Sequence, residues 1–313
     1  MKKIIGICCP VFNEEDNIEN FYNTYSKIFL NYQEKYQLEF LFTDNCSNDK
    51  SFNILKNLTI KNNNVTVIRY SKNFGVMKSI YTGIINVSEK WDAVAVFDCD
   101  LQDPPKLIND FIDKWEEGFK IVFGKRINRE EPKIITILRK IYKRIERSVQ
   151  KEVQEVESGA WFLDKKIIDE IKKKNRFEPY LPGLINSLGF KSRSIPYDRI
   201  KRANGVSKFN FFSYLSYATD GIVSGTMIPL RISIYFGVFF GTFAICLSIF
   251  FILAKFIFEI DYAEGIAAMI VFTLFNFGIN FLFLGIIGEY VGRVYNKKDI
   301  EEPAIIDEFI SKE

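Results

Sequence analysis

The sequence contains no histidine. This absence excludes catalytic triads built on histidine, histidine general bases and histidine-ligated metal centres. The five cysteines include no CxxC pair, and four of them lie in or beside apolar, strand-like runs. That pattern favours buried free thiols in a reducing compartment over disulfides or structural zinc.

Two phosphate-binding loops are also missing. No GxGxxG follows the first strand-like run and no GxxxxGK[ST] occurs anywhere, which argues against a dinucleotide-binding fold and a P-loop nucleotidase. The N-terminus, MKKIIGICCPVFNEE, reaches acidic residues too early for a signal peptide. The formal net charge of +3 is nearly balanced and indicates no class of partner.

What is present begins with two long apolar segments near the C-terminus. Residues 232–254 and residues 266–287 carry no charged side chain. Each is long enough to cross the ~30 Å hydrocarbon core of a bilayer as a helix. We therefore predict two transmembrane helices within residues 232–291, at about 232–256 and 266–290. The alternative is a pair of buried core helices, although uncharged runs of this length are rare in soluble proteins.

The flanks of these segments predict their orientation. Arg231 precedes the first, Arg293 and two lysines follow the second, and the loop between them is acidic. By the positive-inside rule both flanks, and hence both termini, are cytoplasmic. Residues 208–231 are rich in aromatic side chains and predict an interfacial juxtamembrane helix. Residues 292–313 then form a short cytoplasmic tail with no evident chemistry.

Residues 1–125 alternate between two patterns. Strands are predicted at 4–9, 38–43, 65–70 and 93–97, and helices at 17–29, 51–58 and 76–86. Strands that alternate with helices indicate an α/β fold with a mostly parallel sheet covered on both faces.

The segment Val94–Pro105, VAVFDCDLQDPP, carries the strongest chemical signal. If the strand continues, Asp98 and Asp100 point to one face and Cys99 to the other. Two carboxylates close together repel each other, and a divalent cation relieves that repulsion. A cation with few protein ligands takes phosphate oxygens as well, so we predict a metal–diphosphate site at the carboxyl end of this strand. The alternative is an acidic turn closed by proline.

A basic amphipathic segment lies between the two halves of the chain. Residues 133–151 carry isoleucines and a leucine at helical spacing, with lysines and arginines on the other face. Such a helix suits an anionic membrane surface, and an ordinary surface helix of the domain is an equal alternative. The predicted membrane segments argue against nucleic acid as the partner of this face.

Five short motifs follow the predicted strands or precede the apolar segments. In chain order they are Pro10-Val-Phe-Asn-Glu-Glu15, Thr43-Asp44-Asn-Cys-Ser-Asn-Asp49, Ser71-Lys-Asn-Phe-Gly75, Asp98-Cys-Asp-Leu-Gln102 and Arg202-Ala-Asn-Gly-Val-Ser-Lys208. Their order and spacing resemble inverting family 2 glycosyltransferases with a GT-A fold, over nearly the whole chain. The closer resemblance is to polyprenyl-phosphate glycosyltransferases related to dolichol-phosphate mannose synthase, which carry a C-terminal two-helix membrane anchor.

The resemblance implies a cytoplasmic GT-A catalytic domain over residues 1–207 and a role for each motif. Mg²⁺ or Mn²⁺ would be held by Asp100 and Gln102. Four residues would take part in catalysis: Asp98, Asp100, Arg126 and Arg202. The nucleotide-sugar donor would be bound by Pro10, Phe12, Glu14, Asp44, Lys72, Asp98, Ser207 and Lys208. Asp49 is expected to cap the next helix. The alternatives for the other residues are that Asp44 caps its turn and that the two arginines are solvated surface cations.

Two departures from the family pattern bear on the mechanism. Where many relatives read Gly-Asp-Phe-Arg-Leu, this chain has Gly159-Ala-Trp-Phe-Leu163, and it has Asn45-Cys46 where Asp-Gly is common. The first removes a carboxylate often assigned as catalytic. A lipid phosphate acceptor is mostly dianionic at pH 7 and needs no general base, whereas an alcohol does. The loss therefore favours a phosphate acceptor, although Glu157 or Asp103 are possible substitutes.

We therefore predict an inverting transferase that moves a sugar, from a UDP-sugar by weak resemblance, to a polyprenyl phosphate such as undecaprenyl phosphate. It would be an integral protein of the bacterial plasma membrane with a cytoplasmic catalytic domain. Glycines and asparagines in the spans predict a homo-oligomer, such as a tetramer. The alternatives are transfer to a lipid or saccharide hydroxyl, and a non-catalytic membrane scaffold of the same fold.

Overall fold

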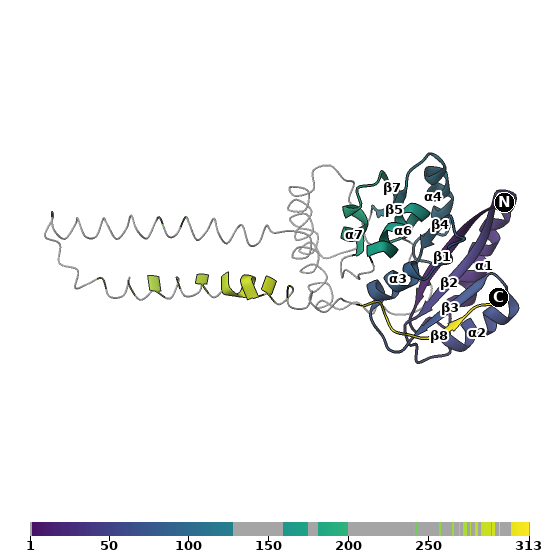
Figure 1. Cartoon of the computed structure of the whole chain (residues 1–313), viewed down its shortest axis with the longest axis horizontal. Coiled ribbons are helices and arrows are strands. Elements are labelled where there is room, and N and C mark those ends of the chain that lie inside the picture. The colour runs from purple at the N-terminus through teal and green to yellow at the C-terminus, as the bar shows by residue number, and fades with distance from the viewer. Residues whose placement is uncertain are drawn as a thin grey trace. The chain divides into compact units, whose positions relative to one another are not determined.

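The computed structural model describes residues 2–127, 159–174, 181–199 and 302–312, with scattered positions between 239 and 294. The chain forms two units, Met1–Gly221 with Glu301–Glu313, and Ile222–Ile300. The first unit carries the sheet (Figure 1). Its strands are β1 (Lys3–Val11), β2 (Tyr36–Asp44), β3 (Val65–Tyr70), β4 (Ala93–Val96), β5 (Ile121–Arg126), β6 (Trp161–Asp164), β7 (Ser192–Tyr197) and β8 (Ile306–Ile310). Its helices are α1 (Ile18–Phe29), α2 (Ser51–Lys61), α3 (Val76–Ile85), α4 (Leu107–Glu116), α6 (Lys165–Lys174) and α7 (Leu181–Ser187), with a short 3₁₀ turn at Leu30–Tyr32.

The eight described strands form one sheet in the order β7-β5-β6-β4-β1-β2-β3-β8. The pairs β1–β2, β1–β4, β2–β3 and β5–β7 are parallel, whereas β6 and β8 run antiparallel to their neighbours. The α/β fold and all seven elements predicted over residues 1–125 are confirmed, with ends that differ by a few residues. Strands buried on both faces consist of nearly continuous apolar runs, which is why β1 to β4 were visible in the sequence.

Helices cover both faces of the sheet, and each face has its own apolar core. Ile7 and Phe42 point to the face that packs against Phe111 of α4 and against α1 and α2. Their strand neighbours Cys8 and Leu41 point to the other face, toward α3, α6 and α7. This alternation along each strand divides the core into two layers and holds the sheet rigidly between them.

The strand directions bring six loops to one edge of the sheet. β1 to β4 are parallel, and β5 and β7 run the same way because β6 is antiparallel to both β4 and β5. The carboxyl ends of β1, β2, β3, β4, β5 and β7 therefore meet at one edge, which we call the loop edge. Both chain termini lie at the opposite edge (Figure 1). Open α/β sheets bind ligands at the carboxyl ends of their strands.

The last residues of the chain complete this sheet. β8 pairs antiparallel with β3, and Lys56 of α2 forms a 2.8 Å ion pair with Glu308. Just before β8, the amide of Ala304 donates to Thr82 Oγ1 at 2.8 Å, and the Ile305 carbonyl accepts from the Ser71 amide. Residues 292–313 were predicted to form a short tail, and strand β8 within them was not predicted.

Several predicted segments lie outside the described residues. They include the basic segment 133–151, the interfacial segment 208–231 and most of residues 232–291. Within the parts of the chain that the structure describes, no helix combines the length and the apolar character needed to cross a membrane.

Candidate active site

The loop after β4 carries the acidic motif and differs from its prediction in one respect. β4 ends at Val96, so Asp98, Cys99 and Asp100 lie in the following turn and not in the strand. The prediction that strand alternation separates their side chains is therefore wrong. The turn still separates the two side chains, because Cys99 is buried in the core and Asp98 remains partly exposed.

Leu101 closes this turn in a strained conformation. Its φ of 53° lies in the left-handed region, which is unfavourable for a bulky side chain. The Gln102 amide donates to Asp100 Oδ1 at 3.2 Å, and the Leu101 side chain packs against the core. Strain of this kind persists where the surrounding structure imposes it, often at functional sites.

Two arginines and a tyrosine converge on the carboxylates of this loop. Asp103, which is 3% exposed, accepts from Tyr197 Oη at 2.8 Å and from Arg199 Nε at 3.1 Å through Oδ1. Its Oδ2 accepts from Arg126 Nη2 at 3.4 Å. Arg126 Nε also donates to Tyr197 Oη at 3.0 Å, and Arg199 Nη2 lies 3.3 Å from Asp98 Oδ2. We call these five residues the acid–arginine cluster.

Tyr197 and Arg199 were not predicted from the sequence. They stand at the end of β7, a half-exposed strand whose sequence, SRSIPY, lacks a continuous apolar run. The available signal was their position just before the basic motif that begins at Arg202.

The net effect of burial and the charges of the cluster is to raise the pKa values of Asp98, Arg126 and Tyr197. Desolvation, followed by the nearby charges of Asp103 and Asp100, raises the pKa of Asp98 to about 6, against the opposing effect of Arg199 and Arg126. Burial works to lower the pKa of Arg126, but Asp103 and Tyr197 raise it overall, so this arginine stays charged. The loop therefore holds more negative charge than its arginines neutralise.

The side chains of the acidic turn suit a divalent cation that takes part of its coordination from the protein and the rest from substrate phosphates. The described residues contain no group of three or more Asp, Glu, Cys or His side chains arranged to hold a metal ion. Asp98, Asp100 and Gln102 offer oxygen ligands at the excess of negative charge. Mg²⁺ is commonly bound through one or two carboxylates, with water and substrate phosphates completing the coordination.

The loops after β1 and β2 are locked together by hydrogen bonds. The Asn13 amide donates to Ser47 Oγ at 2.9 Å, and Asn13 Oδ1 accepts from the Asn48 amide at 2.8 Å. One residue later, the Glu14 amide donates to Ser51 Oγ at 2.8 Å. The family resemblance assigns these two loops to binding of the nucleoside. The hydrogen bonds join them into one surface at the loop edge, which we call the nucleoside clasp.

Asp49 belongs to this clasp and also serves the next helix. Its Oδ1 accepts from the amide of Ser51, the first residue of α2, at 2.9 Å, and its Oδ2 accepts from the Glu15 amide at 3.3 Å. Asp49 was predicted to cap α2. The N-cap residue is Lys50, and Asp49, one residue earlier, accepts from the first helical amide and ties the start of α2 to the loop after β1.

Asp44 ends β2 in a fully buried position. Its carboxylate accepts from the Ser47 amide at 3.2 Å and lies 3.6 Å from Arg69 Nε. Burial is the main cause that raises the pKa of Asp44, and Ser47 and Arg69 partly offset it. Cys46 has a φ of 60°, a left-handed conformation that glycine adopts without strain.

The loop after β3 is attached to the same clasp. Asn45 Nδ2 donates to Asn73 Oδ1 at 2.9 Å, and Asn45 Oδ1 accepts from the Phe74 amide at 2.9 Å. Lys72 is exposed on this loop, with its ammonium 5.1 Å from the centre of the Phe74 ring. The loop is thereby held at the clasp, with a cation facing solvent.

Most predicted site residues reach the loop edge. They are Pro10, Phe12, Glu14, Asp44, Lys72, Asp98, Asp100, Gln102 and Arg126. Arg202, Ser207, Lys208 and Glu157 lie outside the described residues. Ala160, where the family resemblance leads one to expect a carboxylate, is fully buried just before β6. The acid of β6, Asp164, lies at the other end of the strand and accepts from Trp115 and Lys120, so it does not take that place.

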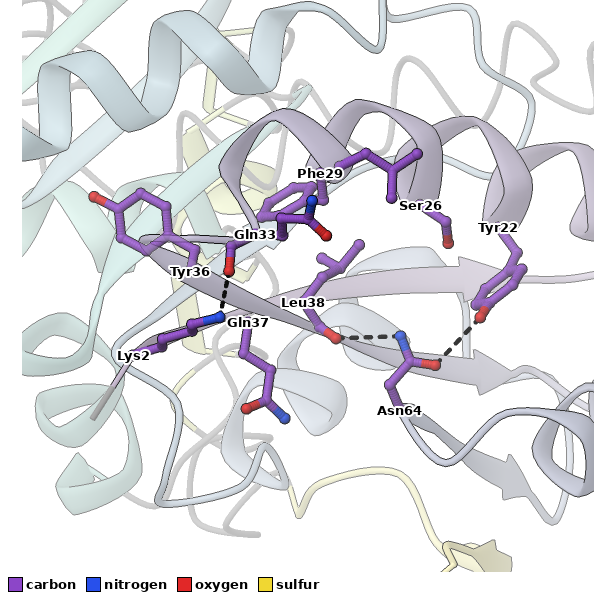
Figure 2. A pocket seen from close by; sticks show the side chains of 10 residues that line it. Lys2, Tyr22, Ser26, Phe29, Gln33, Tyr36, Gln37, Leu38 and Asn64 are labelled. Atoms are coloured by element: carbon purple, nitrogen blue, oxygen red, sulfur yellow. Dashed lines mark hydrogen bonds between the residues drawn. The ribbon is translucent and has the colours of Figure 1, made fainter.

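A pocket of about 380 Å³ lies at the opposite edge of the sheet (Figure 2). It is formed by the second half of α1 and the beginnings of β1, β2 and β3. Its lining includes no carboxylate, and its one cation, Lys2, donates to the Gln33 carbonyl at 2.6 Å. This pocket lacks the acids and arginines of the loop edge, so it is not the candidate active site.

The fold and the site together define a class of protein, namely glycosyltransferases with a GT-A-like mixed α/β sheet. The chain is similar to the mannosyl-3-phosphoglycerate synthase of Rubrobacter xylanophilus, with a TM-score of 0.53, 16% identity, and coverage of 73% of this chain and 74% of that one. At this identity the likeness supports the fold alone.

Sequence comparisons define the family. The model of glycosyl transferase family 2 matches residues 6–172, more than half of the chain. The putative glycosyltransferase CsbB of Bacillus subtilis is 32% identical over 93% of this chain and 88% of its own length. The bactoprenol glucosyl transferase of Shigella phage SfV is 29% identical over 93% of this chain and 94% of its own. The chain belongs to glycosyl transferase family 2 and is a glycosyltransferase.

Proposed function

We propose that this enzyme transfers a sugar from a nucleotide-sugar, with a UDP-sugar as the first candidate, to a polyprenyl phosphate. The observation that carries the proposal is the acid–arginine cluster beside Asp100 and Gln102, at the edge where the nucleoside clasp also lies. The relatives named bactoprenol glucosyl transferases support the acceptor class.

The donor would lie across the loop edge. Its nucleoside would meet the clasp near Asp44, and its diphosphate would meet Arg126 and the acidic turn. Mg²⁺ or Mn²⁺, held by Asp100 and Gln102 with Asp98 beside it, would stabilise the charge that develops on the departing diphosphate. Arg126 would act on the same charge, because its pKa keeps it protonated at any physiological pH.

The state of Asp103 favours a phosphate acceptor. Its two oxygens accept hydrogen bonds from a hydroxyl and two guanidinium groups. Both oxygens of this buried carboxylate are therefore occupied by donors of the protein, which leaves neither of them directed at an acceptor hydroxyl. A phosphomonoester is largely dianionic at pH 7 and attacks an anomeric carbon without a base, in line with the missing carboxylate at Ala160.

The directions of two strands are compatible with a catalytic unit beside a bilayer. β7 ends at the loop edge and β8 begins there, so the chain between them leaves and re-enters the sheet at that edge. Because residues 1–221 and 301–313 form one unit, the chain between them crosses a bilayer an even number of times or not at all. Two spans, with the catalytic unit and both termini in the cytoplasm, satisfy this condition.

The test uses the full chain purified in detergent, with undecaprenyl phosphate, Mg²⁺ or Mn²⁺, and a panel of radiolabelled nucleotide-sugars. We expect metal-dependent transfer to the lipid from at least one donor, with a product that mild acid cleaves, as a glycosyl phosphate should be. An acid-stable product would instead indicate transfer to a hydroxyl. Absence of transfer from every donor would contradict the proposal.

Variants of the acidic turn make this test specific. Asp100→Ala should lower kcat about 10²–10³-fold, the loss typical of one preorganised group that stabilises transition-state charge. The control is Cys99→Ala, which changes the neighbouring buried side chain and should retain turnover. An active Asp100→Ala enzyme would remove Asp100 from the mechanism.

A further inference from the structure

Arg199 is the residue of the acid–arginine cluster that connects its two sides. Its guanidinium contacts Asp103 through Nε at 3.1 Å and Asp98 through Nη2 at 3.3 Å. The two carboxylates differ in surroundings, because the Asp103 side chain is 3% exposed and that of Asp98 is 40% exposed. Arg199 thus has one buried partner and one accessible partner.

The buried partner is fixed. Tyr197 and Arg126 hold the Asp103 carboxylate from two further directions, at 2.8 Å and 3.4 Å. Replacing the Arg199–Asp103 contact would leave a buried charge short of one donor, which is costly. The contact with Asp98 is longer and partly open to solvent, so it exchanges more readily.

Counting formal charges shows why an exchange is favourable. Three aspartates of the loop, Asp98, Asp100 and Asp103, face two arginines, Arg126 and Arg199, which leaves one net negative charge. A divalent cation reverses that sign. The cation would attract Asp98. Arg199 Nη2 would then lose its carboxylate partner and could donate to a substrate phosphate instead.

We propose that Arg199 is a substrate-binding residue that exchanges its Asp98 contact for a substrate phosphate when cation and substrate bind, while Asp103 keeps its Nε in place. This inference rests on the proposed function. In the free enzyme Arg199 competes with the cation for Asp98, and in the loaded enzyme it binds phosphate. The phosphate belongs to the donor diphosphate or to the lipid acceptor, two sources with the same chemistry.

The test measures binding without turnover, in the full chain in detergent. Mn²⁺ affinity is followed by electron paramagnetic resonance. Inorganic pyrophosphate and farnesyl phosphate are then titrated at saturating Mn²⁺ as probes of the donor and acceptor phosphates. For Arg199→Ala we expect Mn²⁺ alone to bind roughly twofold to fivefold more tightly, because a competing ion pair is gone. At least one phosphate probe should bind roughly 10–100-fold more weakly.

The opposite signs separate this role from a structural one. A merely structural Arg199 would weaken Mn²⁺ and phosphate binding together or leave both unchanged, and either result overturns the proposal. Weaker pyrophosphate binding identifies the donor diphosphate, and weaker farnesyl phosphate binding identifies the acceptor. Neither arm requires glycosyl transfer, so failure of the proposed function would be recorded separately by the transfer assay.

Two further variants guard against loss of folding. Arg199→Lys retains the charge but has one nitrogen, which cannot hold Asp98 and Asp103 as the guanidinium does. It should show the same pair of opposite shifts, reduced in size. Arg193→Ala removes an exposed cation of β7, the strand that precedes Arg199, and should leave both affinities unchanged. If Arg199→Lys and Arg199→Ala both weaken Mn²⁺ binding, Arg199 does not compete with the cation.

Discussion

At the residue scale, Asp98 links the pH of the medium to cation binding. Its pKa of about 6 lies above the ordinary value of 3.8, so the carboxyl is mostly neutral below pH 6 and mostly charged above it. A charged carboxylate beside the cation attracts it, and we expect Mn²⁺ affinity to increase as pH rises through 6. Titration of Mn²⁺ by electron paramagnetic resonance between pH 5 and 8 measures this change.

The control for this prediction is Asp98→Asn. The amide does not titrate, so Mn²⁺ should bind more weakly and with a smaller dependence on pH. The raised pKa of Asp98 also makes the free energy of unfolding depend on pH. The folded state binds the proton more tightly than the unfolded chain, so this contribution is present at low pH and is lost as pH rises through 6. Equal pH profiles for wild type and Asp98→Asn would contradict the assignment.

Cys46 occupies a backbone conformation that suits glycine better than cysteine. Its φ of 60° is readily adopted by glycine, whereas a β-branched residue adopts it poorly. We expect Cys46→Gly to be more stable than Cys46→Val by about 1–2 kcal/mol, as compared by thermal unfolding of the two variants. A Val variant as stable as the Gly variant would show that the turn relaxes to another conformation.

At the element scale, the sequence predicted the parts of the sheet that are buried on both faces. The runs that became β1, β2, β3 and β4 are apolar almost throughout, and their loops carry the clasp and the acidic turn. β8 was missed because its sequence, IDEFI, is short and forms neither a continuous apolar run nor a regular apolar–polar alternation. Nothing local to residues 306–310 indicates that they pair with β3.

The site was predictable to a similar extent. Asp98, Asp100 and Gln102 follow a strand that is visible in the sequence, so they were expected at the loop edge. Arg126 was expected only from the family resemblance, because the strand that it ends, β5, was not predicted. Tyr197 and Arg199 depend on β7 being parallel to β5, a pairing between segments about 70 residues apart that no local pattern specifies. The role of Asp103 likewise required the positions of three partners from β5 and the end of β7.

One hydrogen bond at this scale attaches the C-terminal segment to α3. Thr82 Oγ1, on a buried side chain, accepts from the Ala304 amide at 2.8 Å. Thr82→Val keeps the shape but leaves that amide without its partner, so we expect a loss of about 1–3 kcal/mol. Limited proteolysis should then cut residues 302–312 faster. Thr66→Val on β3, a half-buried position, is the matched control and should unfold like the wild type.

At the scale of the whole molecule, the enzyme closes its catalytic sheet with residues that follow Ile222–Ile300 in the chain. Catalytic chains truncated before residue 222 lack β8 and expose the edge of β3, which is a hazard for aggregation. A fair test of the anchoring role must therefore keep residues 301–313. The predicted homo-oligomer should be examined on the same full-length and linker-joined chains.

The corresponding experiment replaces residues 222–300 with a flexible Gly/Ser linker of about 20 residues and compares this chain with one truncated after Gly221. We expect the linker-joined chain to retain β8 and the truncated chain to lose about 2–4 kcal/mol, which lowers the unfolding temperature by roughly 5–15 °C. Ser71 is bonded to Ile305 and precedes the loop of Lys72, so truncation should also weaken binding of a nucleoside diphosphate with Mn²⁺. Equal unfolding temperatures and affinities would show that β8 is dispensable, because the donor loops would then hold their positions without the C-terminal strand.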